Sequence, residues 1–84
     1  MTRIKICGIT SVEDAVAASD LGADFVGVVF AESPRRIDAG RAREISRAPQ
    51  RRAQLVGVFM NQPLEAVRSL AAESGLEFVQ LHGD

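Results

Sequence analysis

The chain has 84 residues, of which 46% are hydrophobic and 25% are charged, as in an ordinary globular domain. Ten basic against 11 acidic residues give a formal net charge of −1, so the composition predicts no general attraction to nucleic acid or to an anionic membrane surface. A single cysteine excludes an internal disulfide, and with it the small disulfide-stapled secreted scaffold. The length allows one hydrophobic core and not two.

No segment of the sequence is typical of export or of membrane insertion. No apolar stretch follows the charges at the start of the chain, so we expect no signal peptide. The longest uncharged apolar stretch, Phe25 to Ala31, is far shorter than the ~20 residues that a membrane-spanning helix needs. We therefore expect a cytoplasmic protein without a membrane partner.

Four short apolar segments predict β-strands, and they cover residues 4–7, 25–30, 55–60 and 78–81. The second and third are nearly continuous runs of valine and aromatic residues. Such runs are typical of strands that are buried on both faces, as in a parallel sheet covered by helices. The spacing between successive segments is about the length of one strand plus one helix.

Helical patterns occupy the stretches between these segments. The first follows Thr10 and Glu13, which have the spacing of a capping box, and it ends before Gly22. The second begins after Asp38 as the N-cap and ends before Pro49, because the residue before a proline avoids helical geometry.

The third helix begins near Pro63 and ends before Gly75, with apolar residues from Leu64 to Ala71 on one stripe. The element order is therefore β-α-β-α-β-α-β, which predicts an α/β fold. This repetition does not by itself separate an open doubly wound sheet from a βα barrel. Gly27 and Gly57 lie within two of the strands, and we expect them on the same face of the sheet, where they leave room for larger neighbours.

Alternation along the first and last strands places polar side chains on common faces. Lys5 and Cys7 share one face of the first strand, and Gln80 and His82 share one face of the last. We expect these faces to meet in a common interior, with a site at the carboxyl ends of the strands.

Cys7 is the first candidate for chemistry. It ends a strand, directly before a glycine turn and upstream of a predicted helix N-terminus, which favours the thiolate form of a cysteine. Cys7 is therefore a candidate general base. The alternative is a small buried apolar residue, which is the commoner environment of a free cysteine.

The loop after the second strand carries Arg35 and Arg36. An arginine fork in this place is suited to hold a carboxylate or phosphate bidentately, and the alternative is a solvated loop charge. Seven of the ten basic residues fall between Arg35 and Arg52, but acidic residues interrupt them and no aromatic residue lies among them. A solvated helix face explains this pattern better than a nucleic-acid interface.

His82 lies on the same side as Cys7 by strand alternation, so it either lines the site or is a structural histidine. No second histidine or cysteine cluster gives it metal-ligand spacing, and no glycine-rich phosphate-binding motif occurs in the chain. Asn61 either caps the third helix or lines the mouth of the site.

A series of short motifs runs in order through the whole chain. They are Lys5-Ile6-Cys7-Gly8-Ile9-Thr10, Glu13-Asp14-Ala15, Asp24-Phe25-Val26-Gly27, Phe30, Ser33-Pro34-Arg35, Val56-Gly57-Val58-Phe59 and Val79-Gln80-Leu81-His82-Gly83. Together they resemble the phosphoribosylanthranilate isomerase family. The first and the last motif are specific when they are found together.

The resemblance implies the N-terminal half of a (βα)8 TIM barrel, with residues 1–84 as a single partial domain of three and a half βα units. It implies an isomerase of tryptophan biosynthesis that needs no cofactor and no metal ion. The reaction would be an Amadori rearrangement of N-(5-phosphoribosyl)anthranilate, an aminoaldose, to the aminoketose 1-(2-carboxyphenylamino)-1-deoxyribulose 5-phosphate.

The resemblance also implies roles for individual residues. Cys7 would be the general base that takes the proton from the sugar C2, and Arg35 would bind the anthranilate carboxylate. Strand alternation adds Lys5, Gln80 and His82 as the further candidate substrate-binding residues. Arg36 stands where the family often has an aromatic residue.

The family's general acid, an aspartate, and its phosphate-binding loops belong to the second half of the barrel. No aspartate of this chain matches the acid by motif, so we expect residues 1–84 alone to be inactive. A parallel half-barrel exposes two strand edges and an apolar inner face, so we also expect these residues to self-associate.

Two alternatives remain. One is a related phosphate-binding barrel enzyme of different chemistry, in which the cysteine is structural, and the other is a non-catalytic half-barrel module that dimerises.

Overall fold

The structure, a computed structural model, describes residues 3–30, 36–48 and 52–82. The elements in chain order are β1 (Lys5–Cys7), α1 (Val12–Asp20), β2 (Phe25–Val29), α2 (Ala39–Ser46), β3 (Gln54–Met60), α3 (Leu64–Ser74) and β4 (Phe78–His82). This order confirms the predicted alternation of strands and helices. None of the helices in these ranges has the length and apolar character needed to cross a membrane.

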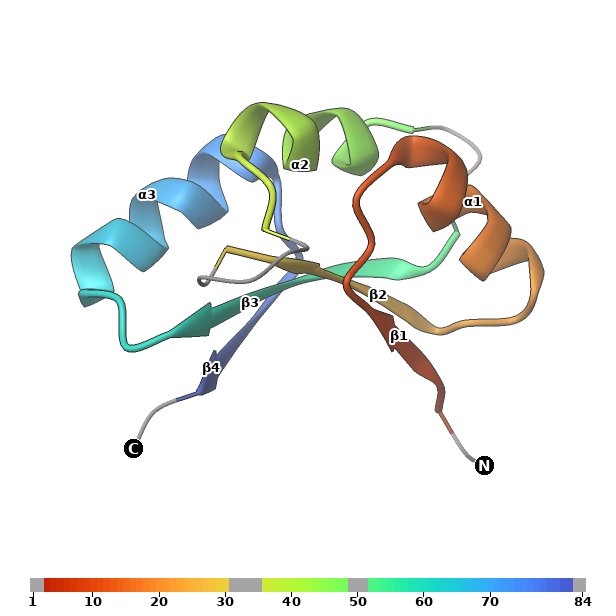
Figure 1. The fold of residues 1–84 in the computed structure, drawn as a ribbon, viewed down its shortest axis with the longest axis horizontal. Coiled ribbons are helices and arrows are strands. Elements are labelled where there is room, and N and C mark those ends of the chain that lie inside the picture. Colours follow the sequence, from red (N-terminus) through yellow and green to blue (C-terminus); the bar gives the residue numbers. More distant parts are fainter. Residues whose placement is uncertain (1–2, 31–35, 49–51, 83–84) are drawn as a thin grey trace.

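All strand pairs are parallel, and the strand order across the sheet is β1-β2-β3-β4. The helices lie together on one side of this sheet, while the N- and C-terminal strands run along the opposite side of the molecule (Figure 1). The other face of the sheet therefore carries no helix in the part of the chain that the structure describes.

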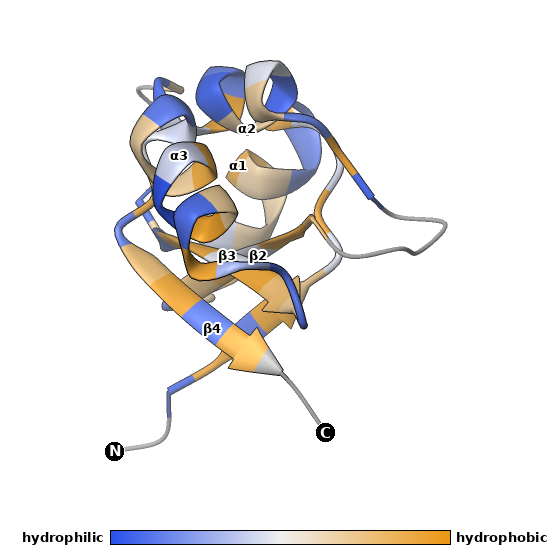
Figure 2. Ribbon diagram, turned by 90° about the vertical axis from the view of Figure 1, so that its left-hand side faces the viewer, coloured by the Kyte–Doolittle hydropathy of each residue, from blue (hydrophilic) through white to orange (hydrophobic). Residues whose placement is uncertain are grey.

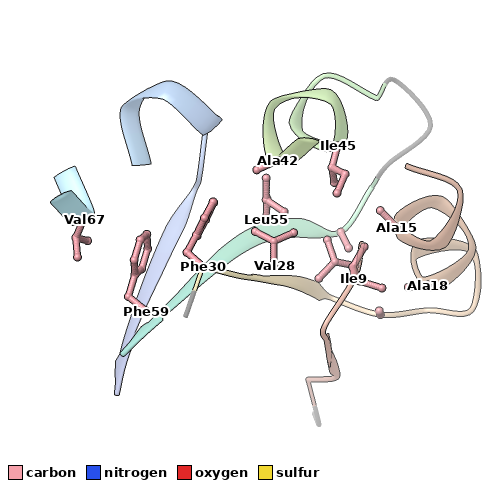
Figure 3. Close-up of a cluster of buried hydrophobic side chains, with 13 residues drawn as sticks. Ile9, Ala15, Ala18, Val28, Phe30, Ala42, Ile45, Leu55, Phe59 and Val67 are labelled. Atoms are coloured by element: carbon pink, nitrogen blue, oxygen red, sulfur yellow. The ribbon is translucent and has the colours of Figure 1, made fainter. Parts of the chain in front are cut away.

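The hydrophobic core lies between the sheet and the helices (Figure 3). Because alternate strand residues point to opposite faces, β2 and β3 send Val26, Val28, Leu55 and Phe59 toward the helices, and all of these are fully buried. Phe59 stacks on Phe30 with ring centroids 5.1 Å apart. The helices complete this core with Ala15, Ala18, Ala42, Ile45 and Val67.

Side-chain N-caps begin α1 and α2, and only the second is the residue predicted from the sequence. The expected Thr10 cap is wrong, because Ser11 has the extended backbone of an N-cap and its hydroxyl accepts a hydrogen bond from Asp14 N at 3.1 Å. Asp38 caps α2 as predicted and accepts from Arg41 N at 2.8 Å.

The predicted glycine stops are confirmed. Gly22 has φ +100°, and it donates to Ser19 O while Ala23 N donates to Ala18 O, both at 3.0 Å. This pair of bonds is the Schellman motif, which turns the chain out of α1 and toward β2. Gly75 ends α3 in the left-handed region with φ +71°.

Gly27 and Gly57 lie on opposite faces of the sheet, so the expectation that they share a face is wrong. Gly27 pairs with Val56 and Val28 pairs with Gly57, which shifts one glycine by a residue relative to the other. Gly27 is on the face of Cys7, and Gly57 is on the helix face. A Cβ at Gly57 would lie 2.3 Å from Leu76 Cδ1, so this glycine gives Leu76 its place in the core.

Side chains from strands that are not neighbours meet on the face without helices. Lys5 on β1 donates a hydrogen bond to the side-chain oxygen of Gln80 on β4. Phe25 on β2 and Phe78 on β4 form an edge-to-face pair with ring centroids 5.8 Å apart. The two edge strands of a flat four-stranded sheet would be about 14 Å apart, too far for the first contact. The sheet is therefore curved like a barrel wall, and this face is concave.

The Gly57→Ala substitution tests the packing of the helix face. The new methyl group would overlap Leu76, so we expect a loss of about 1–3 kcal/mol of unfolding free energy, measured by urea denaturation of residues 1–84. Gly40→Ala on the exposed surface of α2 is the control, because a Cβ there meets only Asp38 Oδ1 at an ordinary 3.5 Å. Equal stability of the two variants would contradict the described packing.

Candidate active site

The concave face collects the polar residues that strand alternation had placed on common faces. In a parallel sheet, residues in register share a face. Cys7 pairs with Gly27, which in turn pairs with Val56. Val58 lies two residues after Val56, on the same face, and it pairs with Gln80. The structure thus confirms that Lys5, Cys7 and Gln80 lie on one face of the sheet.

The backbone after Cys7 is held by one carbonyl group. Gly8 N and Ile9 N both donate to Gly27 O, each at 3.0 Å. Gly8 has φ +82°, a conformation that residues with a side chain rarely adopt. Ile9 is 6% exposed and belongs to the hydrophobic core, so the turn is anchored on its far side as well. Cys7 is therefore fixed at the carboxyl end of β1.

The thiol of Cys7 occupies the space that a side chain at position 27 would fill. A Cβ built on Gly27 would lie only 2.8 Å from Cys7 Sγ. The side chain of Cys7 is exposed on the concave face and not buried in the core, so the reading as a small buried apolar residue is wrong. A fixed and accessible thiol in this place is suited to act as a base or a nucleophile.

The hydrogen bond between Lys5 Nζ and Gln80 Oε1 is the second feature of the site. Its donor belongs to the same strand and the same face as Cys7, two residues earlier in the chain. Figure 2 shows β4 crossing the front of the sheet, with one hydrophilic band between hydrophobic ones along the strand. The concave face therefore combines an apolar surface with a localised positive charge.

Two candidate residues from the sequence are only partly described or not described. His82 pairs with Met60 at the end of β4, and the structure describes this backbone pairing without its side chain. Arg35 lies outside the described residues. Its neighbour Arg36 is exposed and forms a parallel β-bridge with Val29. Arg36 also lines an open cleft, together with Thr10 and with residues at the start of α2.

The loop after β3 is linked to the end of β2 by a residue that sequence reasoning missed. Gln62 donates from Nε2 to Phe30 O at 3.2 Å, and its Oε1 accepts from Met60 N. Asn61 has φ +58°, and Pro63, not Asn61, takes the N-cap position of α3. An amide side chain two residues after the strand was the only signal in the sequence for this link.

The described residues offer no ready metal site. Within residues 3–30, 36–48 and 52–82, no group of three histidine, cysteine, aspartate or glutamate side chains is arranged to hold an ion.

The Gly27→Ala substitution tests the placement of the thiol. The added methyl group would overlap Cys7 Sγ, so the thiol must rotate away, and we expect its alkylation rate with iodoacetamide to change by about threefold or more. The matched control is Gly57→Ala on the opposite face, compared at a temperature where both variants are folded. Equal alkylation rates in wild type and Gly27→Ala would contradict the described contact.

Residues 4–84 match the sequence model of the family N-(5'-phosphoribosyl)anthranilate (PRA) isomerase. The N-(5'-phosphoribosyl)anthranilate isomerase of Rubrobacter xylanophilus is 55% identical over 85 residues, which cover 100% of this chain and 41% of the relative. The isomerase of Bacillus cereus strain B4264 is 49% identical over 82 residues, which cover 98% of this chain and 40% of the relative.

Solved structures agree with these sequence matches. A phosphoribosyl anthranilate isomerase in complex with reduced 1-(o-carboxyphenylamino)-1-deoxyribulose 5-phosphate superposes with a TM-score of 0.93 at 45% identity, over 100% of this chain and 44% of that chain. The isomerase of Thermus thermophilus gives a TM-score of 0.92 at 48% identity, over 99% of this chain and 42% of that chain. The chain thus spans about two fifths of the length of the relatives it matches. It belongs to the N-(5'-phosphoribosyl)anthranilate isomerase family.

Proposed function

We propose that the complete protein containing this chain is an N-(5'-phosphoribosyl)anthranilate isomerase of tryptophan biosynthesis, located in the cytoplasm. Residues 1–84 would form the first half of its (βα)8 barrel, and the concave face would be the lining of the barrel interior. The observation that carries this proposal is the exposed thiol of Cys7 at the carboxyl end of β1. The carbonyl group of Gly27 fixes the turn after Cys7, and the absence of a Cβ on this glycine leaves room for the thiol. In a βα barrel, catalytic residues come from this end of the strands.

The proposed reaction converts an aminoaldose into an aminoketose by moving protons. Opening of the sugar ring, in which the general acid expected in the rest of the barrel would give a proton to the ring oxygen, leaves a protonated imine between C1 and the anthranilate nitrogen. The thiolate of Cys7 takes the proton from C2, and the electron pair of that C–H bond forms a C1=C2 double bond while the imine electrons return to nitrogen. The enol that results becomes the C2 ketone when its hydroxyl proton leaves and C1 gains a proton. Positioned proton transfer of this kind contributes about 10²–10⁴-fold to a rate.

Binding of the substrate is proposed for polar groups around the thiol. Arg35 is proposed to hold the anthranilate carboxylate bidentately, because a guanidinium presents paired N–H donors that match two carboxylate oxygens. Lys5, Gln80 and His82 are proposed to bind the phosphosugar part of the substrate. In support, Lys5 and Gln80 meet on the same face as Cys7, and position 82 lies at the carboxyl end of β4.

The first prediction of this proposal concerns the base. In the complete enzyme, Cys7→Ala removes the group that takes the C2 proton, so we expect kcat to fall by about 10²–10⁴-fold. The exposed position of Cys7 predicts little change in folding, and circular dichroism of the variant should match wild type. A Cys7→Ala enzyme that converts N-(5'-phosphoribosyl)anthranilate at a rate near wild type would exclude Cys7 as the base.

The second prediction concerns residues 1–84 in isolation, which we propose to self-associate. β1 and β4 are the edges of the described sheet, and apolar side chains on or beside them are exposed: Ile4 at 50%, Phe78 at 47% and Leu81 at 64%. Strand edges and apolar patches of this kind favour pairing with another chain.

Sedimentation velocity of residues 1–84 should therefore show a mass that rises with concentration. Leu81→Lys should shift the chain toward the monomer, because it places a charge on the β4 edge. Leu64→Lys is the matched control, since Leu64 is exposed to a similar extent, 62%, on α3. A monomer at every concentration would contradict the proposed association.

A further inference from the structure

We infer that Lys5 and Gln80 act as one unit in this site: Lys5 provides a fixed positive charge beside Cys7, and Gln80 is the positioning residue that holds it there. The inference rests on the proposed function, which it extends from substrate binding to the arrangement of charge around the base. It begins from the hydrogen bond that Lys5 Nζ donates to Gln80 Oε1 across the concave face.

The position of Gln80 along β4 decides where the ammonium group lies. Phe78 is two residues nearer the amino end of the strand, and its ring packs against Phe25, the register partner of Lys5. This aromatic pair presents apolar surface on the amino-terminal side of Gln80, and an ammonium group avoids such surface. Through Gly27 and Val56, Cys7 is in register with Phe78, so Gln80 draws the ammonium group of Lys5 toward the carboxyl end of the strands and past the level of Cys7.

The side chain of Lys5 needs such a partner because it is long and flexible. Fixing a free lysine side chain costs conformational entropy, because several rotatable bonds lose their freedom. A charge-assisted hydrogen bond to an amide oxygen offsets part of this cost before a substrate arrives. The charge near the thiol is then present in the free enzyme, and its position does not depend on the substrate.

The neutral amide suits this role better than a carboxylate would. Glutamine accepts the hydrogen bond without cancelling the positive charge of the ammonium group. Among the described residues, Gln80 Oε1 is the only acceptor for Lys5 Nζ, and the ammonium group has further N–H donors for an oxygen of the bound sugar. Lys5 is thus placed to act on both the base and the substrate.

A double-mutant cycle in the complete enzyme tests this inference. Lys5→Met should lower kcat about tenfold or more while KM changes less, because the charge supports the base and its loss is felt in the chemical step. Gln80→Met should lower kcat by a smaller factor. The Lys5→Met/Gln80→Met double variant should match Lys5→Met within about twofold, because Gln80 acts through Lys5.

Two further variants separate the charge effect from a loss of folding. Gln80→Glu keeps the acceptor and adds a negative charge, so it should reduce kcat while leaving the melting temperature at or above that of wild type. Gln54→Met is the matched control: it makes the same substitution on the same face of β3, and its kcat should equal that of wild type.

Alkylation of Cys7, followed by peptide mass spectrometry, gives a readout that does not depend on turnover. At fixed pH, both Lys5→Met and Gln80→Met should slow the reaction of Cys7 with iodoacetamide, and Gln54→Met should not. Additive losses in the double variant, or unchanged kcat and alkylation rate in Lys5→Met, would overturn the inference. An inactive wild-type enzyme would instead refute the proposed function, and the alkylation series would still test the Lys5–Gln80 unit.

Discussion

The hydrogen bonds that Gly8 N and Ile9 N donate to Gly27 O are the interaction on which the site depends. They tie the end of β1 to the middle of β2 and fix the turn after Cys7. The same glycine leaves open the space that Cys7 Sγ occupies. One residue thus sets both the backbone and the side chain of the proposed base, and any side chain at position 27 would disturb the thiol directly.

Curvature of the sheet is the second constraint, and it brings side chains from strands that are not neighbours into one site. The contacts between Lys5 and Gln80 and between Phe25 and Phe78 join strands that are separated in the sheet. The helices cover only the opposite face, where the core lies (Figure 3). Half of a barrel wall therefore already brings an apolar surface, a positive charge and a thiol together on one face.

Much of this arrangement follows from the sequence, because alternation within a strand reports faces directly. It correctly placed Lys5 and Cys7 on one face of β1. Alternation does not show which residues of two different strands share a face, because a one-residue change of register moves every side chain of a strand to the other face. Gly27 and Gly57 were assigned to one face for this reason, and the register places them on opposite faces.

Contacts that depend on the curvature of the sheet or on the path of loops could not be predicted from the sequence. The link from Gln62 to Phe30 and the bond from Lys5 to Gln80 join residues that are far apart in the chain, and their partners are fixed only when the sheet is formed. The N-cap of α1 was predicted one residue too early, at Thr10, and the structure has Ser11 there. Both hydroxyl residues suit the cap chemically, and the folded backbone gives the extended N-cap conformation to Ser11.

The most direct test of the account is turnover of N-(5'-phosphoribosyl)anthranilate, measured side by side for purified residues 1–84 and for the complete protein that contains them. The proposed base and substrate ligands lie in residues 1–84, and the proposed general acid lies in the rest of the barrel. We therefore expect turnover by the complete protein and none above the buffer rate by residues 1–84. Turnover by residues 1–84 alone, or its absence in the complete protein, would contradict the account.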